Sequence, residues 1–189
     1  MFFPLLTQRL SISPLQLSDL DAFIGYRQDP EVARFQSWDP SYSTAQGADL
    51  IQSQHGVDFP APDEWLQIGI RLRANSELVG DLALHAMQEP GEFEIGFSVA
   101  TEHQGQGYAF EAAKALLDKL FQERGAVSVV AFTDSRNTSS KALLRKLGFI
   151  EDPTRSWIEE FKGETVEVLF FELVRPAPQE FASSHPAGQ

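Results

Sequence analysis

Two glycines in the middle of the chain separate a strand-like segment from a helix-like segment. They are Gly105 and Gly107, in the run Glu102-His103-Gln104-Gly105-Gln106-Gly107-Tyr108-Ala109. This layout directs successive backbone N–H groups at one point, next to the positive end of a helix dipole. Such a point suits a phosphate or pyrophosphate. The loop therefore predicts a ligand that contains a nucleotide.

Two other nucleotide-binding loops fit these residues less well. A dinucleotide fold needs Gly-x-Gly-x-x-Gly after its first strand and an acidic residue about 20 positions later. Here only Gly105-Gln106-Gly107 is present, in the middle of the chain. A nucleoside-triphosphate loop needs Gly-Lys-Ser/Thr, which the sequence lacks.

The loop is expected to be held by a strand–helix–strand unit. Residues 92–99 predict a strand, and apolar residues at helical spacing over 108–124 predict a helix. The apolar run 127–132 is typical of a buried strand. This order implies a parallel pair of strands with a right-handed crossover.

The rest of the pattern predicts an α/β fold with a mixed sheet. The other strand pairs are expected to be antiparallel, so the sheet is mostly antiparallel, with about seven strands and about four helices. Further strands are expected at 9–15, 65–72, 78–86, 157–161 and 165–174, and helices at 18–28, 44–55 and 138–146, with a short helix from 30. We expect residues 1–175 to form a single domain and the tail, residues 176–189, to be disordered.

Composition narrows the classes of partner. The 189 residues carry a net charge of −12, which argues against general nucleic-acid binding and favours cationic substrates such as amines. Acidity that only keeps the protein soluble is the alternative. No apolar run reaches membrane-spanning length, and the four histidines are scattered, so neither a membrane span nor a metal site is predicted. The absence of cysteine fits a cytoplasmic protein.

Several motifs together resemble the GCN5-related N-acetyltransferases (GNAT). Gln104-Gly105-Gln106-Gly107-Tyr108-Ala109 fits the acyl-CoA loop Gln/Arg-x-x-Gly-x-Gly/Ala of that family. Matching elements occur in the same order at Thr7-Gln8-Arg9-Leu10, Glu94-Ile95-Gly96-Phe97, Asn137-Thr138-Ser139-Ser140 and Leu147-Gly148-Phe149. They are similar to the RimJ/RimL-type branch, which acetylates N-terminal amines of ribosomal proteins. The resemblance covers about residues 7 to 174.

The resemblance implies a GNAT fold, in which the parallel pair of strands splays apart. It also implies an acetyl-CoA-dependent N-acetyltransferase whose acceptor is a primary amine of a protein N-terminus or a small molecule. Because the chain has no cysteine, an acetyl-cysteine intermediate is excluded, which favours direct attack in a ternary complex. A non-catalytic acyl-CoA-binding module is the alternative. A homodimer is compatible with either reading.

The resemblance implies that backbone groups bind the coenzyme. Those of the loop would bind the pyrophosphate, and those of the splayed strand the pantetheine and the thioester carbonyl. Asn137 would bind pantetheine and also suits a helix N-cap. Lys141 and Arg145 could reach the 3′-phosphate of CoA or could be a solvated pair. The backbone set is Phe97, Ser98, Val99, Gln104, Gly105, Gln106, Gly107, Tyr108 and Ala109.

Two side chains are candidates for moving protons. Glu94 matches a frequent catalytic position of the family and could deprotonate the substrate ammonium. It could instead anchor the charge of the substrate or be a solvated strand residue. Ser140 could donate a proton to the departing thiolate or hold a water. It could equally help to cap its helix.

Aromatic residues are candidates for the walls of the acceptor pocket. Phe35 and Trp38 precede the helix at 44–55, in a region that forms one wall in this branch. Trp157, on the last hairpin, could form the opposite wall. The alternative for Phe35 and Trp38 is a hydrophobic plug.

Overall fold

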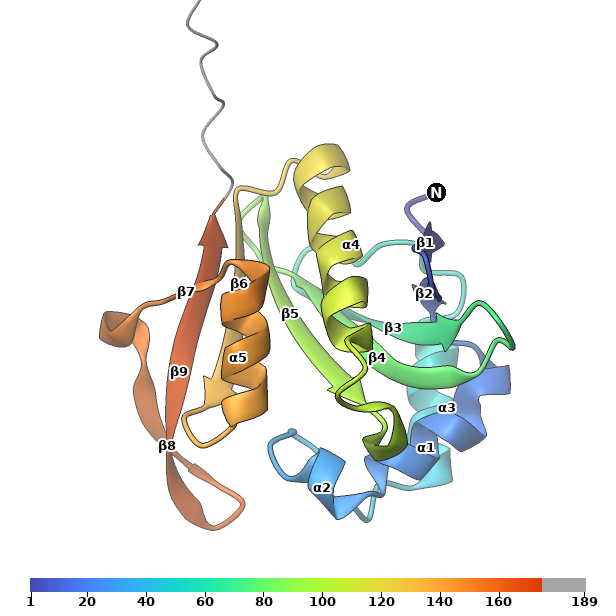
Figure 1. The fold of residues 1–189 in the computed structure, drawn as a ribbon, viewed down its shortest axis with the longest axis horizontal. Coiled ribbons are helices and arrows are strands. Elements are labelled where there is room, and N and C mark those ends of the chain that lie inside the picture. The colour runs from blue at the N-terminus through green and yellow to red at the C-terminus, as the bar shows by residue number, and fades with distance from the viewer. Residues whose placement is uncertain (175–189) are drawn as a thin grey trace, which may run out of the picture.

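Residues 1–174, which the computed structural model describes, fold around one sheet with helices on both faces (Figure 1). The strands are β1 (Leu5–Leu6), β2 (Leu10–Pro14), β3 (Glu64–Leu72), β4 (Leu78–Ala86), β5 (Glu92–Val99), β6 (Ser128–Asp134), β7 (Ile150–Glu151), β8 (Trp157–Phe161) and β9 (Glu164–Val174). The α-helices are α1 (Leu20–Arg27), α2 (Pro30–Ala33), α3 (Thr44–Ser53), α4 (Tyr108–Glu123) and α5 (Thr138–Leu147). The tail expected to be disordered, 176–189, lies outside the described residues.

The predicted mixed, mostly antiparallel architecture is confirmed. The strand order is β1-β2-β3-β4-β5-β6-β9-β7, with β8 also paired to β9, and only β5 and β6 run parallel. Over residues 1–174 the sheet has nine strands, where about seven were expected. The two additional strands, β1 and β7, have two residues each, too few for an alternating pattern to show. The same part of the chain forms five α-helices, where about four were expected, and the fifth is the four-residue α2, which corresponds to the short helix expected from residue 30.

The parallel pair separates soon after it begins. Three registered pairs join β5 to β6, from Glu92 with Ser128 to Glu94 with Val130. Beyond them β5 stays paired with β4, and β6 stays paired with β9. The two strands therefore diverge toward the lower edge of Figure 1, where the N-terminal ends of α4 and α5 lie.

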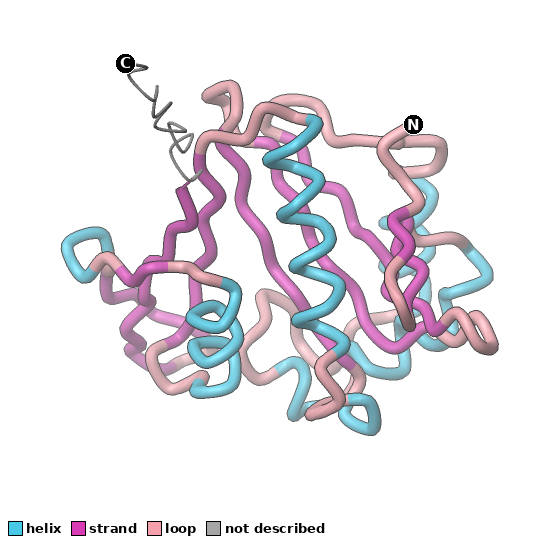
Figure 2. Tube along the Cα trace, turned by 45° about the horizontal axis from the view of Figure 1, so that its top comes forward, coloured by secondary structure: helices cyan, strands magenta, loops and turns pink. Residues whose placement is uncertain are grey.

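Helices α4 and α5 cover one face of the sheet, and α1 and α3 cover the other (Figures 1 and 2). Helix α4 buries Ala112, Leu116 and Leu120 against the strands, in one core cluster with Leu82 and Leu84. Complete burial of each leucine contributes about 2 kcal/mol, so this helix is firmly held. A smaller cluster, which includes Phe23, Ile24 and Ile51, packs α1 and α3 on the opposite face.

Polar side chains alternate with this core along β4 and β5. Asp81 and His85 of β4 point away from α4, since Leu82 and Leu84 point toward it. Their register partners on β5 are Ser98 and Glu94. One face of the sheet is thus polar beside the gap between β5 and β6. Among the helices of residues 1–174, none has the length and apolar character needed to cross a membrane.

Candidate active site

A pocket of about 540 Å³ occupies the open end of the gap between β5 and β6. The glycine loop and α4 form one side, the first turn of α5 forms another, and the segment around α2 completes it. The structure brings most of the predicted coenzyme residues to this pocket. Its lining includes Phe35, Phe97, Ser98, Val99, Gln104, Gly105, Gly107, Tyr108, Ala109, Asn137 and Ser140.

The glycine loop has the backbone conformation that its sequence predicts. Gly105 and Gly107 have φ angles of 72° and 80°, a region that disfavours residues with a Cβ. Gly107 immediately precedes α4, so the free N–H groups of the first helical turn open toward the pocket side of the loop. A pocket at such a helix start suits an anion.

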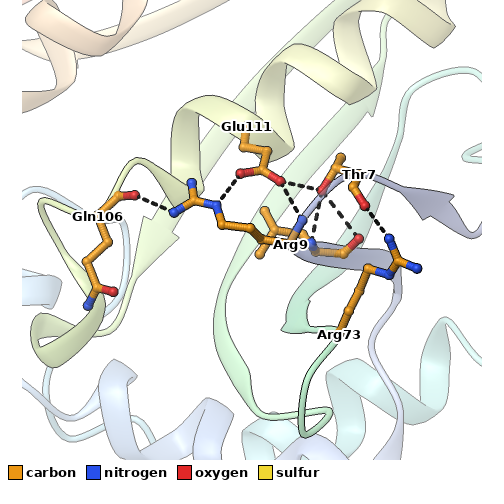
Figure 3. A network of polar contacts seen from close by, with 6 residues as sticks. Thr7, Arg9, Arg73, Gln106 and Glu111 are labelled. Carbon is orange, nitrogen blue, oxygen red and sulfur yellow. Dashed lines mark hydrogen bonds and ion pairs between the residues drawn. The ribbon is translucent and has the colours of Figure 1, made fainter.

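Glu111, in the first turn of α4, ties the loop to the N-terminal strand (Figure 3). Its carboxylate accepts hydrogen bonds from Thr7 Oγ1 at 2.6 Å, and from Arg9 N at 3.0 Å and Arg9 Nε at 2.7 Å. Arg9 Nη1 also donates to the Gln106 carbonyl at 2.9 Å. Burial raises the pKa of Glu111, but these bonds outweigh burial and hold it below its ordinary value. The motif around Arg9 is visible in the sequence, but this contact between Arg9 and Glu111 is not.

Two carbonyl groups of β5 face the gap. The Phe97 carbonyl accepts a hydrogen bond from Gln36 Nε2 at 3.3 Å, and the Val99 carbonyl accepts one from Gln104 Nε2 at 3.0 Å. The hydrogen bonds between β5 and β4 end with Ala100 N donating to Val79 O. The backbone groups of alternate residues, including the carbonyls of Phe97 and Val99, therefore point away from β4. Nothing in the sequence signalled Gln36, which lies in the connection between α2 and α3.

Asn137 caps α5, as predicted. Its Oδ1 accepts a hydrogen bond from Ser140 N at 3.0 Å. Ser140 is nearly buried and lines both the coenzyme-side pocket and a smaller cavity of about 80 Å³ within the gap. Ser140 therefore lines both the coenzyme-side pocket and the gap between β5 and β6.

The spaced pair Lys141 and Arg145 does not line this pocket. Lys141 Nζ donates to the Ser135 carbonyl, and Arg145 Nη2 pairs with Glu151 at 2.8 Å. The next lysine along α5, Lys146, lines the pocket instead. Arg145 is exposed, which agrees with the solvated alternative, whereas Lys141 turns back to the end of β6.

A second pocket, of about 870 Å³, lies on the polar side of the gap. Trp38 and Glu94 line it, whereas Phe35 lies on the coenzyme side. Trp157 packs against Phe132 of this pocket, with ring centroids 5.2 Å apart. These two pockets share Gln36, Phe97 and Ser98, so they meet at the splayed strand.

A buried carboxylate organises the floor of this second pocket. Asp81 is 1% exposed and accepts hydrogen bonds from Tyr26 and Gln67, with Arg27 4.0 Å away. Burial raises the pKa of Asp81, while Arg27, Tyr26 and Gln67 oppose that rise. The guanidinium of Arg27 in turn lies 3.8 Å from the centre of the Trp38 ring. In the sequence, Asp81 is visible only as an acidic residue within the strand expected at 78–86.

Glu94 is a second carboxylate of β4 and β5 that lines this pocket. Its side chain is 22% exposed, and its Oε2 lies 3.5 Å from His85 Nδ1. Burial raises the pKa of Glu94 above its ordinary value, and His85 partly opposes this effect. A raised pKa is the usual adjustment for a carboxylate that accepts protons.

The match to known proteins agrees with this geometry. The family model described as "Acetyltransferase (GNAT) domain" matches residues 9–150. An uncharacterized N-acetyltransferase, p20 of Bacillus licheniformis, is 29% identical over 172 residues, covering 90% of this chain and 96% of p20.

Two solved structures share the fold at low identity. Spermidine N-acetyltransferase of Vibrio cholerae, in complex with CoA and spermine, superposes with a TM-score of 0.76 at 18% identity over 89% of this chain and 96% of that one. RimL, a ribosomal L7/L12 alpha-N-protein acetyltransferase in complex with CoA, has a TM-score of 0.73 at 17% identity over 89% of this chain and 95% of that one.

The chain belongs to the GNAT acetyltransferase family. It is therefore an acyltransferase, as the motifs predicted. The low-identity structures confirm the fold alone and do not identify the acceptor.

Proposed function

We propose that the protein transfers the acetyl group of acetyl-CoA directly to a primary amine in a ternary complex. The observation that carries this proposal is the meeting of two pockets at the splayed strand, with Gln36, Phe97 and Ser98 common to both. One pocket has the glycine loop and a helix start suited to a pyrophosphate. The other has carboxylates and aromatic rings suited to a cationic amine.

Glu94 is the proposed base. The substrate ammonium loses a proton to its carboxylate, directly or through one water, and the nitrogen keeps the electron pair. That nitrogen then attacks the thioester carbonyl carbon, forming a C–N bond as the C–S bond breaks. Ser140 lines the gap and is the proposed donor of a proton to the departing sulfur. The nitrogen loses its second proton as the amide forms, and that proton restores the Ser140 hydroxyl directly or through one water.

The acceptor is proposed to be a small cationic amine rather than a protein N-terminus. The pocket is lined by Asp39 and Glu94, whose carboxylates attract ammonium groups. Trp38, Tyr42 and Trp65, which contact Arg27 or His85, add apolar walls that suit the carbon chain of an amine. The net charge of −12 favours the approach of such molecules. A structural relative holds spermine, which supports the same class.

A mass-spectrometric screen with acetyl-CoA tests the proposal. The panel contains diamines, polyamines, aromatic amines and short peptides with free N-termini. Glu94→Gln should lower kcat for the best acceptor by about 10²–10⁴-fold, because general-base catalysis contributes that much. The affinity for CoA, measured by calorimetry, should not change.

Glu92→Gln is the matched control, since Glu92 lies on the same strand and face but outside the lining of the acceptor pocket. It should retain wild-type kcat. If wild-type protein binds CoA and acetylates no amine in the panel, the chain is a binding module and the enzymatic proposal is wrong.

A further inference from the structure

His85 stands in the middle of a row of three side chains that crosses the polar face of the sheet. It pairs in register with Trp65 on β3 and with Glu94 on β5. Its imidazole ring stacks on the Trp65 indole, with centroids 4.6 Å apart and planes 6° apart. Stacking fixes the plane of the imidazole, so its two nitrogens point along defined directions.

The two nitrogens of His85 face two different carboxylates. Nδ1 lies 3.5 Å from Glu94 Oε2, and Nε2 lies 3.5 Å from Asp63 Oδ1. Among the described residues, these are the charged groups recorded within ion-pair distance of the ring. The exposed fraction of the side chains is 22% for Glu94, 15% for His85 and 63% for Asp63. His85 therefore connects Glu94, which lines the acceptor-side pocket, to the exposed carboxylate of Asp63.

His85 Nδ1 is a buried nitrogen without a hydrogen-bond partner. A buried polar atom is normally paired, so an unpaired one beside a carboxylate calls for an explanation. In the neutral tautomer whose Nε2–H points at Asp63, Nδ1 is unprotonated and can accept a proton. Catalytic hydrogen bonds are often long before substrate binds, which fits the 3.5 Å separation from Glu94.

We propose that His85 relays the proton that Glu94 takes from the substrate ammonium, and releases it at Asp63 to solvent. The relay rests on the proposed role of Glu94 as the base. The O–H bond of protonated Glu94 breaks as an N–H bond forms at Nδ1, and the Nε2 proton passes to Asp63 or water. One proton leaves the site, no electrons are transferred, and Glu94 is ionised again. His85 is left with its proton on Nδ1, and proton exchange with water returns it to the Nε2–H tautomer before the next turnover.

His85→Ala tests the relay by chemical rescue. Loss of the ring should lower kcat by about 10- to 100-fold, the lower part of the range for proton transfer, and leave the KM for acetyl-CoA unchanged. Added imidazole should restore turnover through the vacated space beside Trp65. Triazole, similar in shape but a much weaker base, should restore less. His55→Ala, an exposed histidine outside this row, is the matched control.

Outcomes for the relay and for the proposed function differ. If Glu94→Gln is inactive but His85→Ala turns over like wild type, the relay is wrong and the base assignment stands. If imidazole and triazole restore turnover equally, His85 only fills space and the relay is also wrong. If Glu94→Gln retains wild-type kcat, the assignment of Glu94 as the base is wrong, and the relay that rests on it is wrong as well.

The pH profile is a second readout that a purely structural role would not move. Burial raises the pKa of Glu94 and His85 opposes that rise, so His85→Gln should raise the pKa of Glu94 further. Because Glu94 must be ionised to act as a base, the acidic limb of the kcat/KM profile should move to higher pH. An unchanged acidic limb would contradict the proposed coupling of the two side chains.

Discussion

The coenzyme-side pocket and the acceptor-side pocket are built in different ways. The first is formed mainly by residues 97–109 and the start of α5, and its distinctive groups belong to the backbone. The second draws side chains from the connection after α2 and from α1, α3 and strands β3 to β6. Binding in the coenzyme-side pocket should thus depend on backbone conformation, and binding in the acceptor-side pocket should depend on which side chains meet there.

Different contacts hold the two pockets in place. Arg9 and Glu111 fasten the glycine loop to the start of β2. On the acceptor side, Lys162 Nζ at the tip of the β8–β9 hairpin donates to the carbonyls of Ala33 and Trp38, at 2.7 Å and 2.6 Å. Variants of Arg9 are therefore expected to affect acetyl-CoA, and variants of Lys162 are expected to affect the acceptor.

The largest effect is expected for Gly107→Glu. A side chain at φ 80° strains the backbone, and its carboxylate repels the pyrophosphate. Strain of about 1–3 kcal/mol corresponds to a loss of affinity of about 10- to 100-fold, to which the repulsion adds. Calorimetry with CoA measures the loss. Gly125→Glu is the control, since Gly125 also has a positive φ but follows the far end of α4. Equal CoA affinity in both variants would remove the loop from the binding site.

Ser140→Ala is expected to lower kcat by about 10-fold, less than full acid catalysis, because a thiolate of pKa about 8.5 leaves readily. The KM for acetyl-CoA should change little, since Ser140 contributes its backbone N–H to the cap and not its hydroxyl. Steady-state kinetics with both substrates varied provides the measurement. Unchanged kcat would leave Ser140 as part of the helix start only.

Arg9→Gln is expected to raise the KM for acetyl-CoA by about 5-fold, since a partly exposed charged hydrogen bond contributes about 1 kcal/mol. Kinetics with saturating acceptor checks this value. Arg73→Gln is the control, because Arg73 donates to the Thr7 carbonyl in the same network but does not contact the loop (Figure 3). A similar KM for acetyl-CoA in the two variants would argue against a role for Arg9 in holding the glycine loop.

The same network makes a prediction for stability against pH. The folded-state pKa of Glu111 is lowered, so its contribution is present above the unfolded pKa of about 4.3 and is lost as pH falls through the folded pKa. Melting temperatures of wild type and Arg9→Gln should therefore differ at neutral pH and converge in acid. Calorimetric scans between neutral pH and pH 3 test the convergence.

The smallest effect is expected for Lys162→Met, which frees the segment after α2. The KM for the acceptor should rise by about 3-fold, the scale of a partly exposed contact, while the KM for acetyl-CoA stays constant. Lys114→Met, which removes only a surface ion pair with Asp118, is the control. A rise in the acetyl-CoA KM instead would show that the two pockets are not separately supported.

The glycine loop and the α5 cap could be predicted because each depends on neighbouring residues. Gly105 and Gly107 permit positive φ, and Asn137 accepts from an N–H three residues later. The order of strands and helices followed from periodicity in the same way. Strands β1 and β7 could not be predicted, since two residues show no period.

The acceptor side was decided by tertiary structure. Glu94 meets His85 only because β4 and β5 pair in one register, and a slip of one residue in either strand would put the two side chains on opposite faces of the sheet. Gln36 reaches the gap from a connection that has no pattern of its own. The sequence by itself therefore determined the fold and the coenzyme loop through local conformation. Packing between distant segments decided which side chains face the amine, because register and helix orientation are set by the whole core.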